Sequence, residues 1–219
     1  MRREEGCSIR EIAELVGASK SSVSHWVRDV ALTDAQRERL VRRNPAYNRQ
    51  INGSAVQAAN RRAERIAYQD EGRQLARVGS SMHVAGCMLY WAEGDKSRNT
   101  IGFTNSDPAM IRFFVEFLRT FFDVTSENIR LKCSLFADHE SRRSEIERFW
   151  LDVARLPESC LCRSKVNVYS KYSKKRRRNK LPYGTCRVVV SRTSITQSIF
   201  GAIQEYAGFD RPQWLDARS

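Results

Sequence analysis

Apolar side chains recur at helical spacing through residues 8–28. The apolar positions that set this spacing are Ile12, Ala13, Val16, Val23 and Trp26. Because an α-helix turns once every 3.6 residues, these positions fall on the inward faces of two short helices. The pattern therefore predicts a helical hairpin near the N-terminus, with these side chains in its core.

Capping residues mark the ends of the two helices. Ser8 and Glu11 form an S-x-x-E capping box, which starts a helix. Gly17 permits the left-handed backbone of a tight turn, and Ser19 can cap a second helix over about residues 20–28. A small alanine followed four residues later by glycine, with apolar residues after it, is the spacing of a helix-turn-helix.

The stretch SIREIAELVGASKSSVSHWVRDV, residues 8–30, resembles the DNA-binding part of the resolvase-type helix-turn-helix family. The resemblance implies that the second helix lies in the major groove. Only seven residues precede Ser8, so the third helix is either the segment headed by the T-x-x-Q box at Thr33 or lies upstream of Met1. The alternative is a hairpin that merely packs on the rest of the protein. The implied contacts to bases and phosphates are Lys20, Ser21, Ser24, His25 and Arg28.

Residues 44–80 carry few large apolar side chains and many Ala, Arg and Gln. This composition favours a long solvated helix over about residues 54–78, which we interpret as a linker. Its arginines can follow phosphates, or they form an ordinary charged face. These arginines are Arg49, Arg61, Arg62, Arg65 and Arg73.

Over residues 81–208 the spacing of apolar residues changes several times between the helical and the strand period, which predicts a mixed α/β domain. Apolar residues recur at helical spacing from Ile111 to Phe122, from Ile146 to Val153 and from Ile195 to Tyr206. Strict alternation in IRLKCSLF, residues 129–136, predicts a half-buried strand. An earlier short strand lies in TIGFTNSDP, where the aspartate can cap the next helix and the proline can open it.

Two further strand patterns, KVNVYS at 165–170 and TCRVVVS at 185–191, are interpreted as a hairpin. Between them, residues 171–180 hold seven cations in ten residues. A two-stranded ribbon fits the major groove, and a basic loop can run along phosphates. The alternative is a solvated loop with no defined partner. The expected contacts from these strands and their loop are Arg130, Lys132, Lys165, Asn167, Tyr169, Lys174, Lys175, Arg176, Arg177, Arg178 and Arg187.

The stretch GCMLYWAEGDKSRN, residues 86–99, ends an apolar helix in Ala-Glu-Gly. Together with the following GFTNSDPAMIRFFVEFLRTFF, it resembles the LAGLIDADG family of homing-endonuclease-like DNA-binding domains. The resemblance implies a sheet that contacts DNA and a helix-end acid, here Glu93, that holds divalent metal beside the scissile phosphates. Mg²⁺ favours one or two carboxylates plus phosphate oxygens. The alternative is that Glu93 is a helix-end acid paired with Lys96 or Arg98.

A second copy of this acidic helix end is missing from SIFGAIQEYAGFD, where Ala207 precedes the glycine. Two half-sites in one chain are therefore not expected. A DNA-cutting form would require a homodimer.

Charge and composition agree with a polyanion partner. The formal net charge is +13 at pH 7 and the pI is about 9.9, which predicts attraction to nucleic acid, with an anionic membrane surface as the rival. No apolar run reaches the roughly 18 residues of a membrane span, and MRREEGCS lacks the apolar core of a signal peptide. The six cysteines contain no C-x-x-C pair, so we expect reduced thiols in a cytoplasmic protein.

The expected fold class is α+β: a helix-turn-helix domain over 1–43, a basic helical linker over 44–80, a LAGLIDADG-like α/β domain with an antiparallel sheet over 81–208, and a tail over 209–219. The expected function is sequence-specific binding of double-stranded DNA for the regulation of transcription, without a required cofactor. The alternative is a DNA endonuclease that uses Mg²⁺ at Glu93.

Overall fold

The structure, a computed structural model, describes residues 1–43, 45–167 and 181–217. The chain divides into two compact units, Met1–Arg61 (unit 1) and Arg62–Ser219 (unit 2). It is an α+β protein, as the sequence predicts, and helix α5 (Pro45–Arg77) passes through the boundary. Among the described residues, none of the helices combines the length and the apolar composition that a membrane crossing needs.

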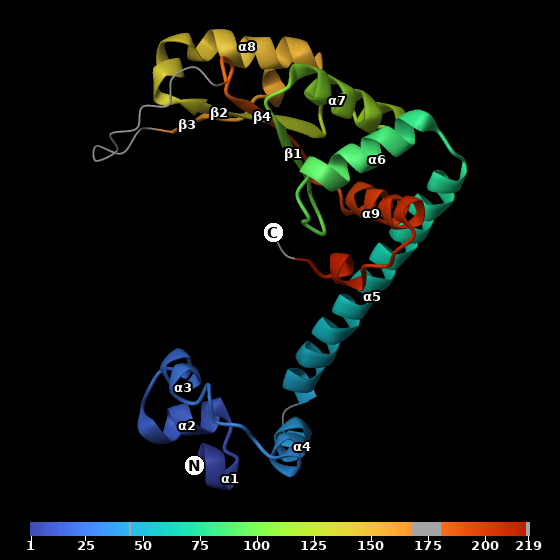
Figure 1. Ribbon diagram of the computed structural model, residues 1–219. Coiled ribbons are helices and arrows are strands. Elements are labelled where there is room, and N and C mark those ends of the chain that lie inside the picture. The colour runs from blue at the N-terminus through green and yellow to red at the C-terminus, as the bar shows by residue number, and fades with distance from the viewer. Residues whose placement is uncertain (44, 168–180, 218–219) are drawn as a thin grey trace. The chain divides into compact units, whose positions relative to one another are not determined.

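Unit 1 is helical and contains α1 (Arg2–Glu5), α2 (Ile9–Val16), α3 (Lys20–Trp26) and α4 (Asp34–Arg43), followed by the first part of α5 (Figure 1). The predicted capping box is confirmed: the Glu11 N–H donates to Ser8 Oγ at 3.1 Å, and the Ser8 N–H donates to Glu11 Oε2 at 2.7 Å. Gly17 ends α2 with a left-handed φ of 67°. The caps and the turn residue therefore fix this hairpin locally.

The core of unit 1 is smaller than predicted. Ile12, Ala13 and Val23 are buried, but Val16 is 51% exposed and Trp26 is 61% exposed. The prediction that these two side chains face inward is wrong. Each is the last residue of its helix, next to the C-cap.

Helix α4 contacts the rest of unit 1 through polar groups. Its start is confirmed, because Thr33 and Gln36 form the predicted box, with the Thr33 N–H donating to Gln36 Oε1 at 2.9 Å. None of its residues is buried. Arg39 donates to the carbonyl of Glu5, and Arg43 lies 3.4 Å from a carboxylate oxygen of Glu11. Helix α4 therefore does not complete an apolar core as a third helix.

The sheet of unit 2 has the strand order β1-β4-β2-β3. Its strands are β1 (Ile101–Asn105), β2 (Ile129–Phe136), β3 (Lys165–Asn167) and β4 (Thr185–Val190). Strand β4 pairs antiparallel with β1 and β2, whereas β3 pairs parallel with β2. The predicted hairpin and the predicted all-antiparallel sheet are therefore wrong. Strand β4 has β1 on one side and β2 on the other, so β3 cannot pair with it. The long connection from β2 through α8 instead brings β3 beside β2 in a parallel direction.

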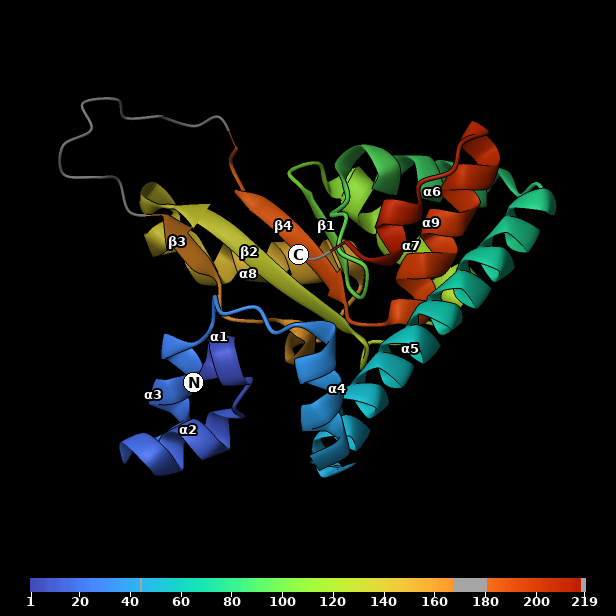
Figure 2. The same ribbon diagram turned by 90° about the horizontal axis from the view of Figure 1, so that it is seen from below.

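Helices α7 (Pro108–Phe122) and α8 (Arg143–Ala154) lie on the same face of this sheet (Figures 1 and 2). Asp107 caps α7 by accepting from the Ala109 N–H at 2.7 Å, as predicted. The alternation of β2 is also confirmed, since its inward residues are buried and Arg130, Lys132 and Ser134 are exposed. The connections include short 3-10 helices at Ala137–Arg142 and Glu158–Cys160.

Helices α6 (Ser81–Glu93), α9 (Thr193–Ala207) and the second part of α5 pack beside the sheet. Helix α9 is buried from Ile195 to Gln204. It meets α5 where glycines replace side chains: a side chain at Gly72 would overlap the carbonyl of Ser198, and one at Gly201 would overlap the carbonyl of Gln69. The two helices therefore approach closely because these positions lack a Cβ.

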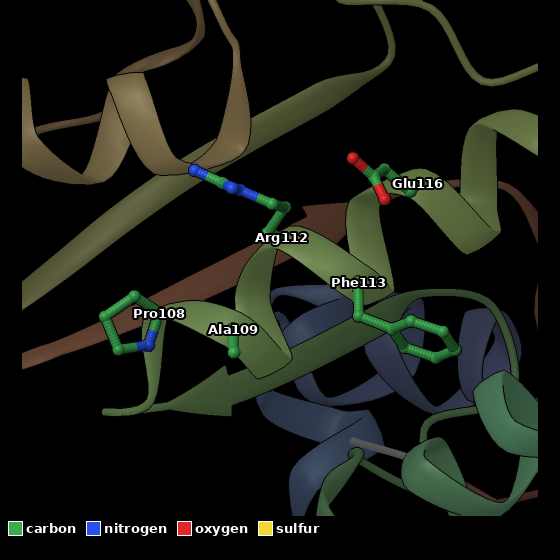
Figure 3. A pocket seen from close by; sticks show the side chains of 5 residues that line it. All are labelled: Pro108, Ala109, Arg112, Phe113 and Glu116. Carbon is green, nitrogen blue, oxygen red and sulfur yellow. The ribbon is translucent and has the colours of Figure 1, made fainter.

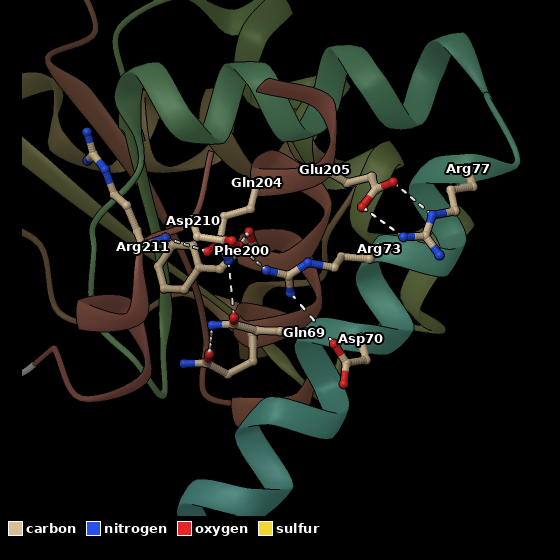
Figure 4. Close-up of polar contacts among 10 residues, drawn as sticks. Gln69, Asp70, Arg73, Arg77, Phe200, Gln204, Glu205, Asp210 and Arg211 are labelled. Atoms are coloured by element: carbon tan, nitrogen blue, oxygen red, sulfur yellow. Dashed lines mark hydrogen bonds and ion pairs between the residues drawn. The ribbon is translucent and has the colours of Figure 1, made fainter. Parts of the chain in front are cut away.

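The second part of α5 is thus not the solvated linker that the composition predicts. Arg65, Gln69, Gly72 and Ala76 are buried, each three or four residues after the last, and so form one stripe of the helix. Gln69 donates to Gln197 at 2.7 Å and accepts from Gln204 at 3.1 Å (Figure 4). Because the stripe is polar and small rather than apolar, its burial is not visible in the hydrophobic pattern.

The arginines of this segment are engaged inside unit 2. Arg73 lies 2.8 Å from Asp210, and Arg77 lies 2.8 Å from Glu205 (Figure 4). Arg62 and Arg65 both pair with Asp216, near the 3-10 helix Pro212–Leu215. Three of the arginines expected to follow phosphates, Arg62, Arg65 and Arg73, therefore have carboxylate partners. Arg61 is exposed, and the side chain of Arg49 lies outside the described residues.

The cysteines are free thiols, as expected. Cys87, Cys133, Cys160 and Cys186 are buried, and Cys7 and Cys162 are half-buried. Burial raises the pKa of the Cys87 thiol well above its ordinary value. The Cys87 thiol therefore stays protonated and packs in the core.

Candidate nucleic-acid interface

The predicted contacts of unit 1 lie on helix α3 and directly after it. Its N-terminus is capped by Ser19, whose Oγ accepts from the Ser22 N–H at 3.1 Å, and its one buried residue is Val23. Among the described residues, Lys20 and Arg28 form no ion pair, and Arg28 follows the C-cap of the helix rather than belonging to it. Every predicted contact residue of this segment is exposed: Lys20, Ser21, Ser24, His25 and Arg28.

The second surface is the outer face of the sheet of unit 2, opposite α7 and α8. Its strands are antiparallel around β4, so the outward side chains of neighbouring strands lie side by side. Lys132 is opposite Arg187, and Ser134 is opposite both Thr185 and Lys165. None of the outward strand positions that the structure describes carries an acid. The cations among them are Arg130, Lys132, Lys165 and Arg187.

These cations are not equivalent. Arg130 is exposed but folds back, since its Nη1 donates to the carbonyls of Glu127 at 2.9 Å and Ile129 at 2.8 Å. Among the described residues, Lys132 and Lys165 form no ion pair. Two ammonium groups with no carboxylate partner are therefore available to an anion on this face.

Arg187 is held by an acid from outside the strands. Its Nη1 donates to Asp95 Oδ1 at 3.2 Å and to Thr104 Oγ1 at 3.4 Å, and its Nη2 donates to Asp95 Oδ2. The two side chains are 36% and 38% exposed. This bidentate arrangement fixes the plane of the guanidinium.

Gly102 makes this arrangement possible. A side chain at this position of β1 would overlap Asp95 Oδ2 and Arg187 Nη2. The Asp95 N–H donates to the carbonyl of Gly102 at 2.8 Å, and the neighbouring Gly94 bridges to Phe103. The segment after α6 therefore lies along β1 and carries the Asp95 carboxylate over the sheet.

Glu93 lies at the end of α6 and is exposed. The alternative, in which Glu93 pairs with Lys96 or Arg98, is not observed as an ion pair among the described residues: Lys96 Nζ donates to the carbonyls of Gly94 at 2.6 Å and Tyr90 at 3.4 Å, and Arg98 donates to the carbonyl of Asp216 at 3.4 Å. Lys96 thus binds the last carbonyls of the helix. Burial lowers the pKa of its ammonium.

No acid of this region makes a complete metal site within the described residues. Groups of three or more His, Cys, Asp or Glu side chains that could hold a metal ion are not found there. Asp95, two residues from Glu93, is engaged by Arg187. Of these two acids, Glu93 is the one without an ion pair among the described residues.

The interior of α6 packs within its own unit. Cys87 is buried, Met88 packs partly buried against the core, and a side chain at Gly86 would overlap the ring of Phe117. His83 is buried, and its Nδ1 lies 2.7 Å from the hydroxyl of Tyr206. These residues stabilise unit 2 itself.

A surface hollow of about 310 Å³ lies at the start of α7 (Figure 3). It is lined by Pro108, Ala109, Arg112, Phe113 and Glu116. Because α7 packs on the inner face of the sheet, this hollow is separate from the outer sheet face. None of the predicted contact residues lines it.

The structure thus brings together Lys132, Lys165, Asn167 and Arg187 on one face, and places Arg130 at its border. Tyr169 and the basic residues Lys174, Lys175, Arg176, Arg177 and Arg178 lie outside the described residues. Sequence reasoning missed the roles of Asp95 and Gly102. A glycine at an outward position of a half-buried strand is the signal that could have indicated a close approach there.

The fold and the two surfaces define a basic α+β protein that exposes the polar side of a short capped helix in unit 1 and a cationic sheet face in unit 2. Comparison with known proteins finds no matching family model, no matching curated protein and no matching solved structure.

Proposed function

We propose that the chain is a sequence-specific double-stranded DNA-binding protein that acts in the cytoplasm as a transcriptional regulator. In this proposal α2 and α3 form a helix-turn-helix, and the outer sheet face of unit 2 contacts DNA as in a LAGLIDADG-like domain. The observation that carries it is that α3 buries Val23 and exposes Lys20, Ser21, Ser24 and His25, with Arg28 exposed just after the helix. The net charge of +13 supports a polyanion as the partner.

The two surfaces have different tasks. The hydroxyls of Ser21 and Ser24 and the ring of His25 are short polar groups suited to base edges. Lys20 and Arg28 supply charge that binds phosphates irrespective of sequence. On the sheet, Lys132 and Lys165 supply the same non-specific attraction.

Selection of bound duplexes from a randomised pool tests the proposal. The wild type should enrich a defined site. Ser24→Ala should flatten the preference within that site, and Lys20→Ala should weaken all duplexes alike. Arg10→Ala is the matched control, because Arg10 is an exposed cation of α2 that pairs with Glu14 at 2.8 Å. An enriched site that survives removal of all five predicted contact side chains would refute the helix-turn-helix assignment.

A second candidate, a LAGLIDADG-type metal-dependent endonuclease, is favoured by one observation: Glu93 is exposed and has no ion pair among the described residues. A bound Mg²⁺ would supply Lewis-acid stabilisation of the cleaved phosphate. A homodimer would bring a second copy of Glu93 to the DNA.

The same selection, repeated with Mg²⁺ or Mn²⁺ and with sequencing of cut molecules, separates the two candidates. The regulatory proposal predicts binding without cutting, and slightly tighter binding for Glu93→Gln because one repulsive charge is removed. Cutting that depends on a divalent ion and disappears in Glu93→Gln would establish the endonuclease instead.

A further inference from the structure

The guanidinium of Arg187 has a fixed orientation, and we draw from it an inference that rests on the proposed function. Arg187 lies in the middle of β4, between Thr104 of β1 and Lys132 of β2. Asp95 holds both of its terminal nitrogens, and Thr104 accepts from Nη1. The side chain is therefore immobilised on the outer face, although 36% of it remains exposed.

These contacts leave one edge of the guanidinium open. A guanidinium has five N–H groups, and Asp95 and Thr104 occupy three of them. The Nε–H and the second Nη2–H point in the same direction and form a parallel pair of donors. Within the described residues neither has an acceptor. Arg187 thus presents a two-donor edge of fixed orientation.

The charge balance indicates what this edge can recognise. Asp95 offsets the charge of Arg187, so the pair adds little to the general attraction for phosphates. A fixed plane with two parallel donors instead suits a partner that offers two acceptors in one plane. In double-stranded DNA those acceptors are the O6 and N7 of guanine in the major groove, or two oxygens of a phosphate.

We propose that Arg187 reads a guanine through its Nε and Nη2 donors, and that Asp95 is the positioning residue for this contact. Neighbouring Lys132 serves as the contrast within the same row of the sheet. It is exposed, has no carboxylate partner among the described residues and ends in a single ammonium. Lys132 therefore contributes charge, whereas Arg187 contributes base discrimination.

The experiment selects duplexes from a randomised pool with wild type, Arg187→Lys, Asp95→Asn and Lys132→Ala. Arg187→Lys keeps the charge but removes the two-donor edge, and Asp95→Asn loosens that edge. Both should lower the preference for guanine at one position of the site by about 5-fold or more, with the other positions unchanged. Lys132→Ala should weaken all duplexes and keep that guanine. Thermal unfolding of each variant identifies a loss that comes from misfolding.

Replacing the guanine with 7-deazaguanine separates the two sources of acceptors. This base pairs normally but lacks N7, so wild-type affinity should fall while Arg187→Lys should be insensitive to the change. If instead the Arg187 variants weaken all duplexes equally and 7-deazaguanine has no effect, the edge binds phosphate and the inference is overturned. A wild type that selects no site at all would refute the proposed function and the inference together.

Discussion

Unit 1 and unit 2 are stabilised by different means. The core of unit 1 consists of Ile12, Ala13 and Val23, and its helices are fixed by caps and a left-handed turn. The core of unit 2 contains large aromatic side chains that are fully buried, including Trp150 and Phe114. Local signals therefore specify the unit with the small core, while long-range packing specifies the other.

The two tryptophans Trp26 and Trp150 should show the largest contrast between the units. Trp150 of unit 2 is fully buried and donates from Nε1 to the carbonyl of Tyr183 at 2.8 Å, whereas Trp26 of unit 1 is 61% exposed. Trp150→Ala should lower the free energy of unfolding of unit 2 by about 3–5 kcal/mol. Trp26→Ala should change stability by no more than about 0.5 kcal/mol. Urea denaturation followed by circular dichroism measures both, and equal effects would contradict the contrast.

Two glycines of helix α5 have different surroundings, although they belong to one helix. Gly53 has open space around it, but Gly72 lies against the carbonyl of Ser198 in α9. Gly53→Ala should raise the free energy of unfolding by up to about 1 kcal/mol, because alanine is the better helix former. Gly72→Ala should lower it by about 1–3 kcal/mol, because the helices must move apart. Stabilisation by both substitutions would show that α5 and α9 do not pack closely.

Acidification should affect unit 2 before unit 1. Burial lowers the pKa of His83 in unit 2, so its unfolded form takes up a proton more readily, and stability falls as pH drops below about 6.5. In unit 1 the hydrogen bonds from Ser8 lower the pKa of Glu11. The stabilisation that the Glu11 carboxylate gives to unit 1 is present above about pH 4.3. It is lost as the pH falls through the lowered pKa of Glu11 in the folded state.

Unfolding measured from pH 7 to pH 3 checks this smallest effect. His83→Gln should remove part of the loss near pH 6 and leave the loss at lower pH intact. A pH profile that is the same in His83→Gln and wild type would contradict the assignment to His83.

Local features were predictable from the sequence, and the pairing between distant segments was not. The capping box of Ser8, the turn at Gly17 and the alternation of β2 each depend on neighbouring residues, and the structure confirms them. The insertion of β4 between β1 and β2 depends on partners far along the chain, and no local pattern specifies it.

The same reason limited prediction of the candidate site. Exposure of the α3 residues follows from helical period, but Asp95 and Arg187 are 92 positions apart and meet because Gly102 leaves room between them. The stripe of α5 that faces α9 is made of Gly72 and polar residues such as Gln69, so hydrophobicity alone could not identify it. Contacts of small and polar groups between distant segments therefore could not be predicted from the sequence, and only the structure reveals them.

Whether α3 reads DNA sequence can be decided by one affinity ratio. Fluorescence anisotropy at fixed salt gives the affinity of the protein for its selected duplex and for a scrambled duplex of the same composition. We expect a ratio of roughly 10³ or more for wild type, which falls toward one when Lys20, Ser21, Ser24, His25 and Arg28 are all replaced by alanine. A ratio near one for the wild type, or a ratio that the replacement leaves unchanged, would contradict it.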